Sequence, residues 1–199
     1  MNDDKHQIDS RSKTGRLFVI SAPSGAGKGT VIKQLQKLKP EIVLSVSATT
    51  RAPRPGEKDG ISYFFVTRER FREMINQGEL LEYAQYVGEF YGTPKNMIDS
   101  CIRQGNDVLL EIEVQGARQI MELRPEAVTI FIIPPDMDEL ERRLRNRKTD
   151  SEEKLAARLE RARVELDEKH NYDYIIINDQ VLRAAEEILS IIDPAERNN

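Results

Sequence analysis

The sequence has little of what redox, metal-binding and membrane proteins depend on. Its 199 residues include one cysteine, Cys101, and two histidines, His6 and His170, that lie far apart in the chain. One cysteine excludes an intramolecular disulfide and a cysteine-based zinc cluster, and two distant histidines disfavour a histidine-led metal site. No apolar run approaches the roughly 20 residues that span a bilayer, and residues 1–16 lack the apolar centre of a secretory signal. We therefore expect a cytoplasmic protein with no membrane partner.

A large net charge is also missing. The chain carries 34 acidic and 30 basic side chains, a formal net charge of −4, which argues against a protein that coats nucleic acid. Taken alone, this balance also predicts little affinity for smaller polyanions. The 39% apolar and 32% charged composition is typical of one soluble globular domain. Residues 1–14 are polar with mixed charge, so we expect a disordered tail there.

Short apolar runs alternate with segments of helical periodicity. Runs typical of buried strands lie at 17–20, 108–110, 128–133 and 174–177, and helical patterns lie at 30–38, 96–104 and 181–192. This alternation predicts an α/β fold with a parallel sheet flanked by helices. Residues 45–95, rich in Thr, Arg, Pro, Tyr and Gly, and the highly charged residues 139–165 interrupt the pattern. We interpret both as insertions into one domain, 15–194, whose core is 15–44, 96–138 and 166–194.

A glycine-rich loop directly follows the first predicted strand and precedes a helix. It consists of Ala22, Pro23, Ser24, Gly25, Ala26, Gly27, Lys28, Gly29 and Thr30. Glycines let successive backbone N–H groups turn toward phosphate oxygens, and the helix N-terminus adds partial positive charge. Lys28 is expected to reach the β- and γ-phosphates of a nucleotide. The alternative is a flexible turn with an exposed lysine.

This loop departs from the common phosphate-binding pattern at both ends. Ala22 stands where the first glycine is usual, and Gly29 stands where a hydroxyl residue usually binds Mg²⁺. We expect the phosphate cradle to survive both changes. Thr30 is then the candidate for the metal, directly or through water.

A second motif indicates which reaction the glycine-rich loop would serve. Residues 49–65 read T-T-R-A-P-R-P-G-E-K-D-G-I-S-Y-F-F and match at every fixed position the pattern T-T-R-x-P-R-x-G-E-x-x-G-x-x-Y-x-F of guanylate kinases. The chain resembles that family over residues 16–193, including Glu82-Tyr83-Ala84, Tyr91-Gly92-Thr93, Leu110 to Gly116 and Asn178-Asp179. The resemblance implies a P-loop core, a GMP-binding insertion at 45–95 and a helical lid at 139–165. It also implies transfer of a phosphoryl group from ATP, with Mg²⁺, to GMP and dGMP, in purine nucleotide metabolism and GMP recycling. The sequence does not decide between a monomer and a homo-oligomer.

The resemblance assigns the acceptor site to eight residues: Ser47, Arg51, Arg54, Tyr63, Glu82, Tyr91, Thr93 and Glu113. The chemistry agrees, because arginine forks match phosphate oxygens and tyrosine hydroxyls add donors. A carboxylate such as Glu82 suits the N1 and N2 donors of guanine, and hydroxyls suit its acceptor edge. The family commonly has an aspartate in the pair that is Glu111 and Glu113 here, so this chain departs from the family pattern by one methylene at that pair. Charges that cap a strand end are the alternative for that pair.

The segment from 141 to 163 holds nine basic and five acidic side chains. A solvated helix pair with ion pairs is one explanation. The resemblance instead implies catalytic arginines at Arg143, Arg147 and Arg158, together with Lys28 and Arg51, and leaves Arg142, Arg145, Arg161 and Arg163 as surface charge. It also places Asn178 and Asp179 near the adenine of ATP.

Two alternatives remain at this point. The Gly27-Lys28-Gly29-Thr30 ending also resembles adenylate kinases, although the T-T-R-x-P-R motif and Glu82 weigh against them. A catalytically inactive guanylate-kinase-like module that binds proteins would lack the P-loop lysine or the acceptor arginines, and this chain has both.

Overall fold

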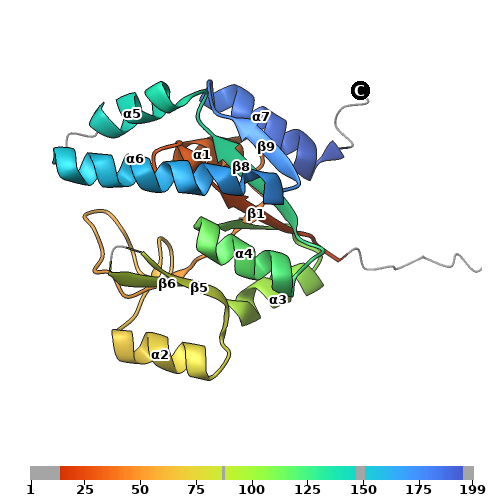
Figure 1. Ribbon diagram of the computed structural model, residues 1–199. Helices are drawn as coiled ribbons and strands as arrows, with labels where there is room; N and C mark the ends of the chain where they lie inside the picture. Colours follow the sequence, from red (N-terminus) through yellow and green to blue (C-terminus); the bar gives the residue numbers. More distant parts are fainter. Residues whose placement is uncertain (1–13, 87, 147–150, 195–199) are drawn as a thin grey trace, which may run out of the picture.

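The computed structural model describes residues 14–86, 88–146 and 151–194. Five parallel strands form its central sheet, in the order β2-β7-β1-β8-β9 (Figure 1). Their bounds are β1 Leu17–Ser21, β2 Val43–Leu44, β7 Val108–Glu111, β8 Val128–Ile133 and β9 Tyr174–Ile177. The expected parallel sheet and its four longer strands are confirmed.

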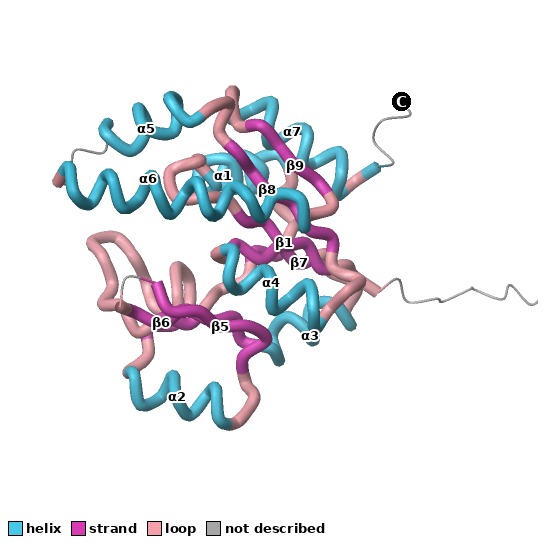
Figure 2. The backbone as a smooth tube through the Cα atoms, viewed as in Figure 1, coloured by secondary structure: helices cyan, strands magenta, loops and turns pink. Residues whose placement is uncertain are grey.

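Helices cover both faces of this sheet (Figure 2). Because successive strand residues point to opposite faces, Phe18 and Ile20 pack in one apolar cluster with α1 (Lys28–Leu38) and α7 (Val181–Ile192). Leu17 and Val19 pack in the other cluster with α3 (Lys95–Arg103) and α4 (Val114–Leu123). This two-sided burial explains why the strands are continuous apolar runs. No helix among the described residues is long and apolar enough to cross a membrane.

A second, smaller sheet with its own helix occupies part of the first insertion. Its strand order is β4-β3-β6-β5, with bounds β3 Ala48–Thr49, β4 Phe64–Phe65, β5 Leu80–Tyr86 and β6 Glu89–Pro94. Helix α2 (Arg68–Asn76) begins after Thr67, whose hydroxyl accepts from the N–H of Arg70. Phe71 and Met74 of α2 pack on this sheet in a separate small core with Ala48. We call this unit the acceptor sheet.

The second insertion forms two helices, α5 (Met137–Asn146) and α6 (Glu152–Asp167), followed by the 3₁₀ turn η1 (Glu168–Asn171). Leu140 and Leu144 of α5 pack on Leu155 and Ala162 of α6. Ser151 caps α6, since its hydroxyl accepts from the N–H of Lys154. The expected catalytic Arg147 lies outside the described residues, as does nearly all of the expected tail at 1–14.

Candidate active site

The glycine-rich loop turns between β1 and α1 as its sequence requires. Gly25 and Gly27 have φ angles of +94° and +92°, a left-handed conformation that strains other residues. Space is equally restrictive at Gly27, where a Cβ atom would lie 2.5 Å from Nδ2 of Asn178. The conformation of the loop therefore requires glycine for two reasons: the positive φ angles, and the close approach of Asn178 to Gly27.

Two side chains from distant segments hold this loop by one carbonyl. Asn178, 2% exposed at the end of β9, donates from Nδ2 to the oxygen of Ala26 at 2.7 Å. Arg143 of α5 donates from Nη1 to the same oxygen at 3.1 Å, and from Nη2 to the oxygen of Asn178 at 2.8 Å. Asp179 is exposed and pairs with Arg183 at 2.8 Å. The contacts of Asn178 and Arg143 thus support the loop itself.

Helix α6 approaches the loop at Ser24. Arg158 donates from Nη2 to Oγ of Ser24 at 3.0 Å, and the buried Glu165 accepts the N–H of Ser24 at 3.1 Å. Arg161, expected to be a surface charge, also donates from Nε to Glu165 at 2.6 Å. With 36% of its side chain exposed, Arg161 is a surface charge that a buried carboxylate one helical turn away holds in place.

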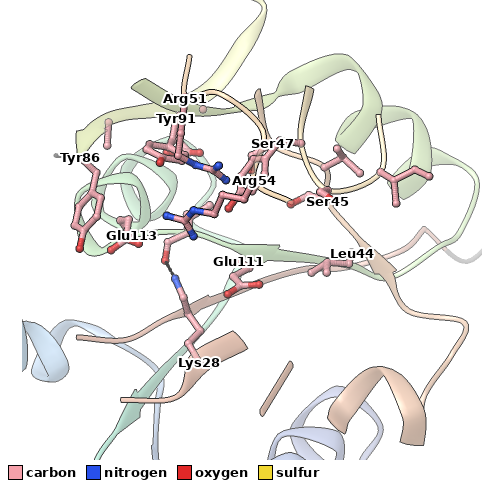
Figure 3. Close-up of a pocket in the computed structure, with 18 of the residues that line it drawn as sticks. Lys28, Leu44, Ser45, Ser47, Arg51, Arg54, Tyr86, Tyr91, Glu111 and Glu113 are labelled. Carbon is pink, nitrogen blue, oxygen red and sulfur yellow. Dashed lines mark hydrogen bonds between the residues drawn. The ribbon is translucent and has the colours of Figure 1, made fainter. Parts of the chain in front are cut away.

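A cavity of about 420 Å³ opens between the loop and the acceptor sheet (Figure 3), a size typical of small-ligand sites. Seven of the eight expected acceptor residues line it: Ser47, Arg51, Arg54, Tyr63, Glu82, Tyr91 and Glu113. Lys28 and Glu111 also line it, from the core side. The Lys28 ammonium donates to the carbonyl oxygen of Ile112 at 2.7 Å. The cavity therefore brings the loop lysine and the expected acceptor residues to one place.

Arg51 is held by a carboxylate to which the sequence reading gave no role. Its Nη1 and Nη2 each donate to Glu57 at 2.9 Å, and Glu57 also accepts the N–H of Arg54 at 2.7 Å. The two hydrogen bonds from Arg51 and the bond from Arg54 lower the pKa of Glu57. This fork orients Arg51 beside the ring of Tyr63, 5.4 Å from its guanidinium carbon. Because Glu57 belongs to the fixed R-x-G-E motif, its position was the available signal.

Glu82 is the buried carboxyl group of the cavity. It is 4% exposed, accepts from the Thr93 hydroxyl at 2.6 Å, and lies against Gly116 of α4, where a Cβ atom would fall 2.1 Å from Oε2. Burial raises its pKa from 4.5 to about 7, although the Thr93 bond and the charge of Lys28 oppose that rise. Thr93 is itself fully buried and does not line the cavity.

Helix α4 fixes the strand beside Glu82. Gln119 accepts the N–H of Tyr83 at 3.2 Å and donates to the oxygen of Tyr83 at 2.7 Å, as a neighbouring strand would. Sequence reasoning missed Gln119 and assigned no role to Gly116, although Gly116 ends one of the motifs that carry the family resemblance. Only the packing of α4 on β5 gives them one.

A phosphate-binding loop on a parallel sheet, opposite an arginine-lined acceptor cavity, defines a P-loop nucleotide phosphotransferase. The family model described as "Guanylate kinase" matches residues 14–195. The guanylate kinase of Synechococcus sp. is 51% identical over 90% of this chain and 83% of its own, and that of Clostridioides difficile is 52% identical over 94% and 90%. The crystal structure of guanylate kinase from Anaplasma phagocytophilum superposes with a TM-score of 0.76 at 38% identity, covering 94% of this chain and 88% of that one.

The chain belongs to the guanylate kinase family, whose members phosphorylate GMP to GDP with ATP. These matches do not support the adenylate kinase alternative or the inactive module. The net charge predicted a low affinity for polyanions, and this prediction was wrong, because a net charge of −4 averages over regions of unlike charge. The positive side chains of Lys28, Arg51 and Arg54 meet at one cavity.

Proposed function

We propose that the cavity between the glycine-rich loop and the acceptor sheet binds GMP, with dGMP as a second acceptor, while residues 22–30 hold ATP. The observation that carries this proposal is the cavity lining, in which Lys28 faces two arginines and the buried Glu82. It supports a phosphoryl donor on the core side and an acceptor nucleotide on the other.

Transfer then needs positioning and positive charge rather than a covalent intermediate. Arg51, Arg54, Tyr63 and Tyr91 hold the acceptor phosphate, which is largely ionised near neutral pH. Lys28, freed from Ile112, contacts the β- and γ-phosphates and stabilises the charge that spreads over the transferring group. No general base is required, because the acceptor phosphate has already lost its proton.

Guanine selection rests on the other end of the cavity. Ionised Glu82 accepts from N1 and N2 of guanine, and Glu113 adds negative charge near the amino group. Ser47 supplies a hydroxyl to the acceptor edge. Thr93 keeps its hydrogen bond to Glu82 and so orients the carboxylate. Thr93 therefore acts on guanine indirectly, through Glu82.

Residues 45–95 act as the GMP-binding insertion and 139–165 as the lid in this proposal. Arg143, Arg147 and Arg158 belong to the lid, and Asn178 and Asp179 to the adenine side. Mg²⁺ bound to the ATP phosphates would neutralise charge on the oxygens. The donor chemistry fits a hard cation, since carboxylate and hydroxyl oxygens suit Mg²⁺, and the Glu111 carboxylate lies beside Gly29 at the start of α1. Glu111 and Thr30, directly or through water, would hold it.

An ADP-release assay with GMP, dGMP, AMP, UMP and CMP offered in turn tests the proposal. We expect turnover with GMP and dGMP and little with the other three. A preference for AMP would overturn the acceptor assignment. ADP release that is independent of any acceptor would overturn the phosphotransfer.

A further inference from the structure

One contact joins the lid segment directly to the acceptor sheet. The guanidinium carbon of Arg161, in α6, lies 4.4 Å from the ring centroid of Tyr86, the last residue of β5. This is within the range of a cation–π interaction. In Figure 1, α6 runs above the end of the acceptor sheet where β5 and β6 lie.

Arg161 is also held by a carboxylate of its own helix. Its Nε donates to Oε1 of Glu165 at 2.6 Å, and the other oxygen of Glu165 accepts the N–H of Ser24 in the phosphate loop. The Glu165 side chain is 9% exposed and that of Arg161 is 36% exposed. A single buried carboxylate therefore connects the guanidinium to the loop and fixes the plane it presents to Tyr86.

Tyr86 in turn leads to the expected phosphate-binding side chains. Its ring meets Tyr91 edge-on at 6.5 Å, and Tyr91 meets Tyr63 edge-on at 6.0 Å. Arg51 lies over Tyr63. A continuous series of contacts thus runs from Ser24 of the donor loop, through Glu165, Arg161 and three tyrosine rings, to Arg51.

The apolar cores on the two sides of this contact are separate. In the described part of the chain, the cluster of α5 and α6 is built on Leu140, Leu144, Leu155 and Ala162, and that of the acceptor sheet on Ala48, Phe71 and Met74. They share no residue. A contact between a charged group and one ring can form and break without opening either apolar core. The contact therefore suits a reversible closure.

We propose that Arg161 and Tyr86 form a latch that holds the acceptor sheet in line with the phosphate loop. Arg161 is a positioning residue that acts through Tyr86, and Tyr86 itself lines the cavity. The latch favours the arrangement competent to bind GMP, so its loss lowers the fraction of molecules in that arrangement. This inference rests on the proposed function.

A double-mutant cycle with Arg161→Ala and Tyr86→Leu tests the latch. Each single variant is expected to raise the KM for GMP roughly two- to fivefold, the equivalent of an exposed cation–π contact, with kcat and the KM for ATP changed less than twofold. The double variant should be no worse than the poorer single variant, because both remove the same contact. Arg163→Ala, an exposed neighbour that pairs with Glu160, should leave the KM for GMP unchanged.

Tyr86→Phe separates the ring from its hydroxyl and should keep the coupling to Arg161. Hydrogen exchange gives a readout independent of turnover, and the amides of residues 80–86 should exchange faster in Arg161→Ala than in Arg163→Ala. Effects on KM that multiply in the double variant, or equal exchange in both arginine variants, would overturn the latch. A wild-type chain inactive on GMP would instead overturn the proposed function.

Discussion

In the proposed function, Glu82 recognises guanine although its burial disfavours the ionised carboxylate. Only its ionised form accepts two hydrogen bonds from guanine, yet burial raises its pKa to about 7, with Lys28 and the Thr93 hydroxyl acting against that rise and Glu113 adding to it. The KM for GMP should therefore increase as the pH falls below about 7.

Glu82→Gln removes that titration and one acceptor. The KM for GMP should rise roughly tenfold or more, the usual loss for a hydrogen bond to a charged group. The GMP phosphate titrates with both proteins, so the difference between their profiles from pH 6 to 8.5 isolates Glu82. Parallel profiles, or an unchanged KM, would remove Glu82 from the guanine site.

Gly116 is the residue that leaves room for this carboxylate. In Gly116→Ala the new methyl carbon would lie 2.1 Å from Oε2 of Glu82. This is a collision, so the carboxylate must move. We expect a higher KM for GMP and an unchanged KM for ATP. Glu82→Asp, one methylene shorter, should cost less in the Gly116→Ala background than in the wild type. An equal cost in both backgrounds would show that the two side chains do not interfere.

Within the glycine-rich loop, the proposed phosphoryl transfer depends most on the Lys28 side chain. Lys28→Ala should lower kcat by orders of magnitude, because the charge on the transferring group loses its fixed counter-charge. Thermal unfolding should show that the fold is intact. Lys33→Ala, exposed on the same helix, is the matched control, and near-normal turnover of Lys28→Ala would refute the role.

Among the elements, the acceptor sheet has the least core. Phe71 is fully buried and stacks on Phe90 at 5.5 Å. Among the described residues, Ala48 and Met74 share its buried cluster, and five partly buried apolar side chains pack against it. Phe71→Ala should cost about 3–5 kcal/mol, a loss that the small cluster has few neighbours to absorb.

We expect the amides of β5 and β6 to lose protection from hydrogen exchange in Phe71→Ala while those of β1 and β8 keep it. Leu123→Ala, at a site 62% exposed, should change neither set. A uniform loss across both sheets would mean that the acceptor sheet does not open as a separate unit.

Elements with strong periodicity were predictable, and the short ones were not. The strands at 17–20 and 128–133 were visible because burial on both faces leaves continuous apolar runs. The strand at 174–177 lies at the edge of the sheet and is largely exposed, but its Tyr-Ile-Ile-Ile sequence still reads as a strand. By contrast β2 and β3 have two residues each, too few for any period. In the acceptor sheet, Ala48 of β3 pairs with Gly92 of β6, where a Cβ atom would meet the carbonyl of Glu82 and the ring of Phe71, and no local pattern reports that.

For the whole molecule, the buried Glu82 makes stability depend on pH. Its folded-state pKa of about 7 exceeds the unfolded value of 4.5, so the folded chain holds a proton that the unfolded chain releases. The stability this proton confers is complete below pH 4.5 and is lost as the pH rises to about 7. Its size is about 3 kcal/mol.

Glu82→Gln removes this dependence. Urea unfolding should show the variant gaining stability relative to the wild type between pH 5 and pH 8. GMP at saturating concentration should stabilise the wild type more than the variant at pH 8. The same stability difference at both pH values would contradict the burial of a titrating carboxyl group.

The sequence by itself determined the sheet, the phosphate loop and the family, because strand burial, glycine conformations and the T-T-R-x-P-R spacing are local properties of the chain. The tertiary structure alone decided what those residues touch. It paired Arg51 with Glu57, buried Glu82 against Gly116 and brought Arg161 onto Tyr86. The contacts of Glu82 with Gly116 and of Arg161 with Tyr86 join segments far apart in the chain, and the energies of all three contacts depend on burial and distance, which residue order does not specify.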